Sequence, residues 1–269
     1  MATLTDVLAD QGRAVRTTLS DAGFALRLLG HALTRVPADL WHRRRFVLDQ
    51  FVVVGVSPLP VVCVVGLFTG MILALQVGVE LAEYGQAERI SDIIGVILFR
   101  EMGPFMTAMI LTASVGSAMA AETGTMAVSE EIDALECLSV DSVSFLVMPR
   151  VLALSVMQPL LTFVACAMGV VGGGVVAFTQ LSVPVEVYFR NVRESLSADP
   201  GFGGWPEEIY TGLIKAVVFG LIISTVSCAS GMKARGGALG VGRAVRSAVV
   251  RCFLLIIIIG YFISWMFFR

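Results

Sequence analysis

Charged side chains interrupt two of the long apolar runs of this 269-residue sequence. Arg100 and Glu101 are adjacent in the stretch ILFREMGPFM, and Lys215 lies in GLIKAVVFG. Charged groups are costly in hydrocarbon, so they normally face a cavity or a partner. An arginine and a lysine near the same membrane surface suit an anionic headgroup such as phosphate, which arginine can bind through two hydrogen bonds at once. Arg100 and Lys215 are therefore candidates for headgroup binding.

Arg100 and Glu101 are consecutive, so on a helix their side chains point about 100° apart. We expect each to have its own partner rather than to pair with the other. In an alternative interpretation the apolar run begins only after Pro104, and both charges lie at the outer interface. Glu122, near the other end of this run, is expected to have a structural role, either capping the next segment or pairing with an arginine of the cytoplasmic loops.

A second group of charges lies between two apolar runs, in the stretch SEEIDALECLSVDS at 129–142. Its acidic residues are Glu130, Glu131, Asp133, Glu136 and Asp141. Ile132, Leu135 and Leu138 recur every three residues, which predicts one apolar face on a short helix. Apolar side chains that enter a groove, with carboxylates that meet basic residues, are typical of a docking helix. The alternative is a solvated loop helix with no partner.

The sequence carries no motif that is typical of an enzyme. A phosphate-binding loop ends in Gly-Lys-Ser or Gly-Lys-Thr, but the two lysines, Lys215 and Lys233, are both followed by alanine. No Ser-His-Asp set or H-E-x-x-H motif is present. The five cysteines and two histidines are scattered, which favours packing over a metal site. We predict no catalytic residue, no metal and no cofactor, so any ATP is hydrolysed by another chain.

The rest of the sequence is strongly apolar. It is 57% hydrophobic and 15% charged, whereas about 25% of residues are charged in an ordinary soluble domain. A helix needs about 20 apolar residues to cross a bilayer, and five such runs are present, at about 51–82, 93–121, 146–178, 209–230 and 247–268. The sequence therefore predicts an all-α polytopic membrane protein. Pro58 and Pro60 predict a kink near the start of the first run, and the net charge of −2 gives no reason to expect nucleic acid.

Basic residues gather at two places in the sequence. Those before the first run are Arg13, Arg16, Arg27, Arg35, Arg43, Arg44 and Arg45. Those around the join of the fourth and fifth runs are Lys233, Arg235, Arg243, Arg246 and Arg251. The positive-inside rule puts both groups on the cytoplasmic side, with the acidic segment also inside, the N-terminus cytoplasmic and the C-terminus external. Residues 83–92 and 179–208 are then external, and the longer segment is expected to be an irregular loop with a short helix around Val185–Leu196.

Residues 1–45 form a region of their own before the transmembrane domain of residues 46–269. Their apolar side chains step by three and four, which predicts one stripe along a helix. Several arginines lie off this stripe, so the helix is expected to lie in the cytoplasmic membrane interface. The alternative is a soluble helix packed on a partner or on the loops.

Glycines in the first and third runs have the small-x-x-x-small spacing. The two pairs are Gly66 with Gly70 and Gly169 with Gly173. This spacing lets membrane helices approach closely, so we predict tight helix packing at these positions.

Several longer stretches resemble the MlaE/YrbE permease family. They are FTGMILALQ (68–76), REMGPFMTAMI (100–110), VGSAMAAETGTMAVSEEIDALECLSVD (115–141), PRVLA (149–153), GLIKAVVFG (212–220) and GGALGVGRAVRSAVV (236–250). Such permeases are homodimeric subunits of ABC transporters that move phospholipid or related lipids. The resemblance implies a cytoplasmic ATPase subunit, an MCE-domain protein on the outer face and a location in a bacterial inner membrane.

The resemblance also suggests roles for individual residues. A lipid pocket between two subunits would be lined by Leu73, Gln76, Leu81 and Tyr84, with Arg100, Glu101 and Lys215 at its polar part. The segment at about 127–140 would be a cytoplasmic coupling helix between the second and third spans. Its residues that contact the ATPase would be Glu130, Glu131, Ile132, Asp133, Leu135 and Glu136.

The sequence departs from the family pattern at a few positions. Ala113 and Ser114 replace a common Gly-Arg pair, so a cavity-facing arginine is missing. Ser139 and Ser142 replace a usual glycine and proline, which is expected to alter how the coupling helix ends. Glu80 lies where an apolar lipid contact is expected.

An ion-coupled secondary transporter is the alternative function. It would use Arg100, Glu101 and Glu122 as an intramembrane charge relay and would need no ATPase. A membrane-embedded enzyme is a weaker third interpretation, because no nucleophile, metal set or cofactor motif supports it.

Overall fold

A computed structural model describes residues 44–85, 89–181, 183–197 and 207–267, together with positions 23, 24, 27, 28 and 30. The described residues form helices and short connections, without a strand. The predicted interfacial helix of residues 1–45 lies outside the described residues, apart from those few helical positions and the start of the first long helix.

Five helical stretches are long and apolar enough to cross a membrane. They are Val47–Leu81, Ile90–Val128, Phe145–Leu181, Glu207–Met232 and Gly237–Phe267. The predicted all-α polytopic fold with five spans is therefore confirmed. The stretches are longer than the apolar runs because their ends continue as helix beyond the most apolar residues.

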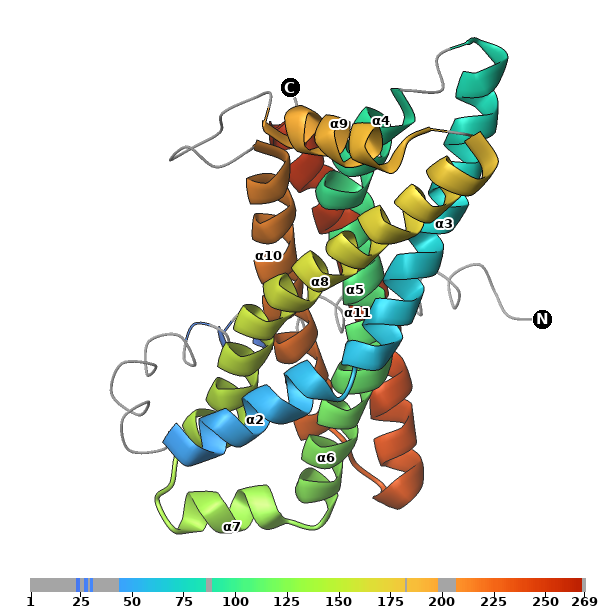
Figure 1. The fold of residues 1–269 in the computed structure, drawn as a ribbon. Helices are drawn as coiled ribbons and strands as arrows, with labels where there is room; N and C mark the ends of the chain where they lie inside the picture. The colour runs from blue at the N-terminus through green and yellow to red at the C-terminus, as the bar shows by residue number, and fades with distance from the viewer. Residues whose placement is uncertain are drawn as a thin grey trace, which may run out of the picture.

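The first stretch is divided into two helices, α2 (Arg44–Val56) and α3 (Leu59–Glu83). The chain turns between them at Ser57 and Pro58, and Figure 1 shows α2 inclined to α3. Proline has no amide hydrogen and restricts the residue before it, so a helix cannot run straight through this point. The predicted kink near Pro58 and Pro60 is confirmed.

The second stretch alternates between α-helix and π-helix. Its segments are α4 (Ile90–Ile97), η2 (Leu98–Met102), α5 (Gly103–Leu111), η3 (Thr112–Gly116) and α6 (Ser117–Val128). The helix begins at Ile90, so Arg100 and Glu101 are both helical, and their position at the outer interface stays an alternative interpretation. Short π-helical turns often occur at functional sites, and η2 contains both Arg100 and Glu101.

Two short helices lie at opposite ends of the bundle. The remaining elements are α7 (Glu131–Cys137), η4 (Val143–Val147), α8 (Met148–Leu181), α9 (Val185–Ser197), α10 (Glu207–Met232) and α11 (Gly237–Phe267). Figure 1 shows α7 below the bundle and α9 across its top. The predicted helix around Val185–Leu196 is present as α9.

Glycines bring α3 and α8 into close contact. A Cβ atom added at Gly70 would collide with the backbone of Gly169, and one added at Gly172 would collide with the carbonyl of Leu67. The predicted tight packing is therefore confirmed, and it joins two helices of the same chain. The two helices cross in Figure 1.

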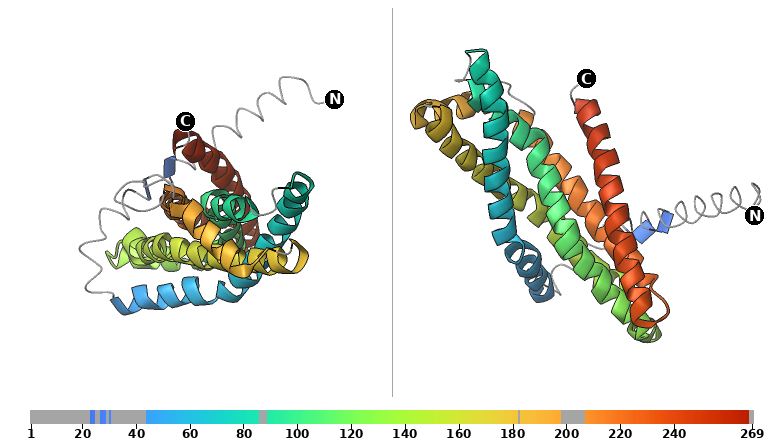
Figure 2. Two further views of the ribbon diagram at one scale, coloured as in Figure 1. Left: turned by 45° about the horizontal axis from the view of Figure 1, so that its top comes forward. Right: turned by 90° about the vertical axis from the view of Figure 1, so that its right-hand side faces the viewer.

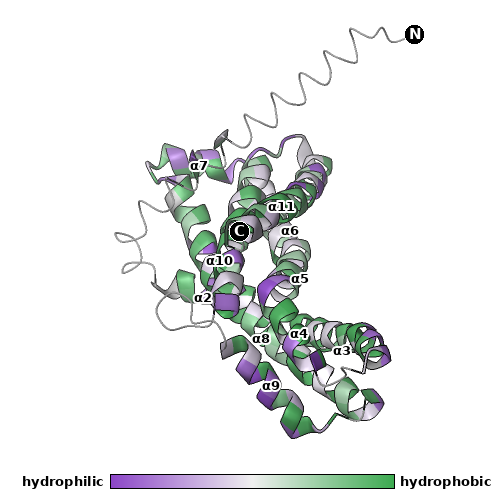
Figure 3. Ribbon diagram, turned by 90° about the horizontal axis from the view of Figure 1, so that it is seen from above, coloured by the Kyte–Doolittle hydropathy of each residue, from purple (hydrophilic) through white to green (hydrophobic). Residues whose placement is uncertain are grey.

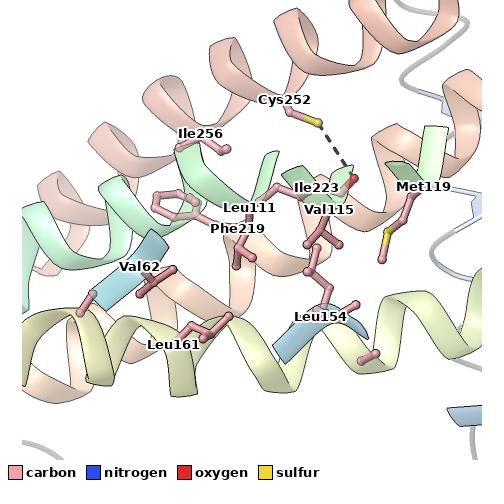
Figure 4. Packing of buried hydrophobic residues seen from close by; sticks show 14 residues of the cluster. Val62, Leu111, Val115, Met119, Leu154, Leu161, Phe219, Ile223, Cys252 and Ile256 are labelled. Atoms are coloured by element: carbon pink, nitrogen blue, oxygen red, sulfur yellow. Dashed lines mark hydrogen bonds between the residues drawn. The ribbon is translucent and has the colours of Figure 1, made fainter. Parts of the chain in front are cut away.

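The central apolar core connects all five spans. Figure 4 shows Leu111, Leu154, Phe219 and Ile256 packed together from four of them. Among the spans, α10 is the most buried and α11 the least. The outward faces of α3, α8 and α11 carry large apolar side chains, as the green ribbons of Figure 3 indicate, and such faces suit a membrane or another membrane helix.

Candidate functional site

A buried lysine organises the polar cluster at the α9 end of the bundle. Lys215, in α10, is 1% exposed. Its Nζ lies 2.6 Å from Oε1 of Glu101 and donates a second hydrogen bond to the carbonyl oxygen of Arg100 at 2.9 Å. The hydroxyl of Ser264, in α11, donates to the same Glu101 oxygen at 2.8 Å. One carboxylate therefore joins three spans.

Proline explains why a lysine is needed at this point. In a regular α-helix the carbonyl of Arg100 would accept a hydrogen bond from the amide of residue 104. Residue 104 is a proline, which has no amide hydrogen. The Lys215 ammonium donates to that oxygen instead, so a polar backbone atom inside the bundle has a partner.

Arg100 belongs to a separate ion pair. Its Nη1 lies 3.7 Å from Oε1 of Glu208, at the start of α10, and its side chain is 30% exposed. The expectation that Arg100 and Glu101 have different partners is therefore confirmed. Two basic and two acidic side chains meet here, so an anion would have to compete with Glu208 for the Arg100 guanidinium.

The residues predicted to line the lipid pocket lie along α3 and directly after it. Leu73 and Leu81 are partly buried in the cluster that contains Ile94, whereas Gln76 is exposed. Tyr84 follows the end of α3 and is 77% exposed. Gln76 and Tyr84 are therefore accessible, whereas the two leucine side chains partly pack against other residues of the same chain.

A groove lies between α3 and the second span. Its empty space is about 260 Å³, part of it open to the outside. The lining residues include Thr69, Met102, Met106 and Thr107, none of which was selected from the sequence. The repeated methionines of REMGPFMTAMI were the available signal, since methionine adapts well to irregular apolar surfaces.

The acidic segment forms α7, whose carboxylates point outward. Its acidic side chains are exposed: Glu130, Glu131, Asp133 and Glu136. Ile132 is 8% exposed and packs in one cluster with Val147, Val151 and Cys228. The structure differs here from the prediction that Ile132 and Leu135 enter a partner's groove, because Ile132 is buried in its own chain and Leu135 is partly buried beside it.

A third ion pair lies at the other end of the second span. Nη2 of Arg150, near the start of α8, lies 2.8 Å from Oε2 of Glu122 in α6. The arginine side chain is 6% exposed and the glutamate 57%. Of the two roles expected for Glu122, the structure shows the pairing with an arginine. The expectation that this arginine lies in a loop is wrong, because Arg150 lies in α8.

Comparison with known proteins covers nearly all of this architecture. A family model described as "Permease MlaE" matches residues 47–266, from α2 into the last turn of α11. The chain belongs to the MlaE permease family. The polar cluster, the groove and α7 are therefore features of an MlaE permease.

Individual relatives extend the match. A protein of Rickettsia bellii named "Probable ABC transporter permease protein" is 35% identical over 96% of this chain and 95% of its own length. A probable ABC transporter permease of Synechocystis is 35% identical over 84% of this chain and 83% of its own. In Arabidopsis thaliana, the chloroplastic protein TRIGALACTOSYLDIACYLGLYCEROL 1 is 31% identical over 90% of this chain and 67% of its own.

The departures from the MlaE pattern have visible structural consequences. Ser114 is exposed in η3, and its hydroxyl donates to the carbonyl of Ile110 at 2.8 Å. No charge therefore projects from the position where the resemblance led us to expect arginine. Ser139 has a φ of 60°, a left-handed conformation that glycine, the residue expected from the resemblance, adopts freely. The serine adopts this conformation at the cost of backbone strain.

Proposed function

We propose that this MlaE permease is the membrane subunit of an ABC transporter that moves phospholipid or a related lipid. A separate cytoplasmic ATPase drives it, and an MCE-domain protein on the opposite face exchanges lipid with it. The observation that carries this proposal is α7, a short helix with exposed carboxylates between the second and third spans. The relatives named as ABC transporter permeases support the same assignment.

The lipid substrate is supported by the name of the plant relative and by the chemistry of the site. That name contains a galactolipid, trigalactosyldiacylglycerol. In this chain, the partly exposed Arg100 and Glu101 lie beside the buried Lys215. We assign the headgroup to this polar cluster and the rest of the lipid to the wall that includes Leu73, Gln76, Leu81 and Tyr84.

Two copies of the chain are needed for a complete pocket. The groove of one chain is partly open to the outside, and little of its space is enclosed. Ligand pockets bury most of the ligand's surface, so this groove alone would leave a two-chain lipid exposed. A pocket between two copies would supply the missing wall, so we propose a homodimer.

The orientation follows from the charges. Exposed basic residues gather at the start of α11, near the α7 end: Lys233, Arg235, Arg243 and Arg246. By the positive-inside rule this end is cytoplasmic, and the α9 end with the C-terminus is periplasmic. We propose an inner-membrane location, with residues 46–269 as the permease domain and residues 1–45 as an interfacial helix.

The ion pairs argue against the alternative of a charge relay. Arg100, Glu101 and Glu122 each contact a different residue from another span or helix. Apolar side chains, including Leu111 and Val115, lie between the two charged regions in the sequence. A secondary transporter would need these charges to exchange partners across that distance.

Purification of the tagged chain from its native membrane in mild detergent tests the proposed function. Mass spectrometry should find an ATPase, an MCE-domain protein and stoichiometric phospholipid with the permease. A homodimer without an ATPase that transports solute in response to an ion gradient would contradict the proposal.

A further inference from the structure

The Glu122–Arg150 ion pair lies at the base of the hairpin that carries α7. Glu122 is in α6, before α7, and Arg150 is near the start of α8, after it. The two residues are 28 positions apart in the sequence, and their charged atoms lie 2.8 Å apart. The pair therefore joins the ends of the second and third spans directly, in addition to the chain that runs through α7.

The burial of the pair is asymmetric. The Arg150 side chain is 6% exposed, and its Nε and Nη1 are buried without a hydrogen-bond partner among the described residues. The fully buried Cys228 of α10 lies beside it. Glu122 is the carboxylate that compensates this buried charge, so its removal would leave the guanidinium without a counter-ion in an apolar environment.

The joins at both ends of α7 are tight. Glu130 and Ser139 flank the helix with φ angles of 62° and 60°. This left-handed conformation is uncommon for residues other than glycine. The amide of Val140 donates to the carbonyl of Leu135 at 3.0 Å. The Ser142 hydroxyl donates to the Glu136 carboxylate at 3.0 Å. A displacement of α7 would therefore be passed to the helices on either side.

Packing connects α7 to the same region. Ile132 lies in one cluster with Val147 and Val151, which are 0% and 2% exposed. Val151 directly follows Arg150 in α8. A force on α7 would thus reach the start of α8 through side chains and reach α6 through the backbone, while the ion pair holds α6 and α8 together.

We infer that the Glu122–Arg150 ion pair makes α6, α7 and the start of α8 a single rigid unit that transmits ATPase motion to both spans. Glu122 and Arg150 are positioning residues in this role, since neither needs to touch the lipid or the ATPase. The inference rests on the proposed function, because it requires an ATPase that displaces α7. Without the pair, α7 would move while the second and third spans separate, and ATP would be hydrolysed with little lipid movement.

The test uses the permease reconstituted with its ATPase and its MCE partner in vesicles of phosphatidylethanolamine and phosphatidylglycerol, with fluorescent phosphatidylethanolamine as the probe. In Glu122→Gln, the lipid moved per ATP hydrolysed should fall about fivefold or more, while ATPase binding stays within about twofold of wild type. Glu122→Asp, which keeps the carboxylate, should restore the ratio. Glu186→Gln, an exposed carboxylate of α9, is the matched control and should not change it.

A distance measurement reports on the rigid unit itself. Cys63 and Cys137 are first replaced by serine. Spin labels are then attached at Ala118 in α6 and Val156 in α8, which are both exposed, and the labelled chains are diluted with unlabelled copies so that only the distance within one chain is measured. In wild type the distance should stay the same when ATP is added. In Glu122→Gln the distribution of this distance should broaden or shift when ATP is added.

The outcomes separate the inference from the proposed function. If Glu122→Gln does not assemble, the double variant Glu122→Gln with Arg150→Gln leaves no charge unpaired and should show the same loss of coupling. If an assembled variant moves as much lipid per ATP as wild type, and its label distance does not change when ATP is added, the inference is wrong but the proposed function stands. A wild-type permease that binds no ATPase would contradict the proposed function, and the inference with it.

Discussion

Nζ of Lys215 and Oε1 of Glu101 lie 2.6 Å apart in an ion pair whose members are unequally buried. The lysine side chain is 1% exposed and the glutamate 44%. The ammonium also donates to the carbonyl of Arg100, so it compensates the missing amide of Pro104. The pair therefore stabilises an irregular stretch of the second span as well as joining that span to α10.

This asymmetry predicts different effects for the two partners. Glu101→Gln leaves a buried ammonium without its counter-ion and should lower the free energy of unfolding by about 3–5 kcal/mol. Lys215→Met removes the buried charge and leaves a carboxylate that is nearly half exposed, but it also leaves the carbonyl of Arg100 without this donor, so the loss should be about 1–3 kcal/mol. Thermal unfolding in detergent checks the order. A larger loss for Lys215→Met than for Glu101→Gln would mean that the hydrogen bond to the Arg100 carbonyl contributes more than the pairing of the buried charge.

The sequence predicts the spans well because hydrophobic length is a local property. It also indicates that Arg100 and Glu101 need separate partners, since consecutive helix positions point in different directions. It does not identify those partners. Glu208 and Ser264 reach the cluster from distant parts of the chain, and no local pattern distinguishes them from other polar residues.

The same limit applies to α7. The three-residue spacing of Ile132, Leu135 and Leu138 predicts an apolar face but not what that face packs against. In the structure Ile132 contacts the chain's own core, while Leu138 is 75% exposed. This face packs against the start of α8 and the end of α10, and no local pattern in the sequence indicates that these segments lie beside it.

Reversing the charge of α7 should abolish docking of the ATPase. The carboxylates of Glu131 and Glu136 are exposed, and in the proposed complex they meet basic residues of the partner. The double variant Glu131→Lys with Glu136→Lys should no longer co-purify with the ATPase. Glu80→Lys with Glu83→Lys, at the other end of the bundle, is the matched control and should retain it. Normal recovery of the ATPase with the α7 variant would rule out this docking site.

Arg100→Ala should reduce the amount of bound phospholipid without disrupting assembly. The side chain is 30% exposed and its carboxylate partner lies 3.7 Å away, so the guanidinium can also contact a phosphate. Loss of a charged hydrogen bond is worth about 1.5–3 kcal/mol, which corresponds to roughly a tenfold or greater loss of affinity. Lipid mass spectrometry per mole of permease measures the effect.

Arg190→Ala is the control for this prediction. Arg190 lies on α9, is 65% exposed and pairs with Glu194 four residues later on the same helix. Its removal should leave the bound phospholipid unchanged. Equal lipid recovery from Arg100→Ala and wild type would mean that the headgroup binds elsewhere.

Ser139→Gly should stabilise the permease. The φ of 60° at Ser139 is strained for an L residue by about 1–2 kcal/mol, and glycine adopts it freely. Glycine also has greater conformational entropy in the unfolded chain, which offsets part of this gain, so a net increase of about 0.5–1 kcal/mol in the free energy of unfolding is expected. Ser129→Gly is the control, because the φ of Ser129 is −82° and its hydroxyl donates to Glu131, so this change should destabilise. Matching effects at the two serines, measured by thermal unfolding, would exclude strain as the cause.

Gly70→Ala should weaken the packing of α3 on α8. The added methyl group would meet the backbone of Gly169, which cannot move aside as a flexible side chain would. Such overpacking costs about 1–3 kcal/mol, so the unfolding temperature should fall. Gly242→Ala, in α11, has no atom within 4 Å of the new methyl group and should instead gain about 1 kcal/mol from helix propensity. Opposite shifts of the two variants would show that close backbone contact, rather than helix flexibility, requires glycine at position 70. A neutral Gly70→Ala would mean that α3 and α8 can separate without loss, and that their contact does not stabilise the bundle.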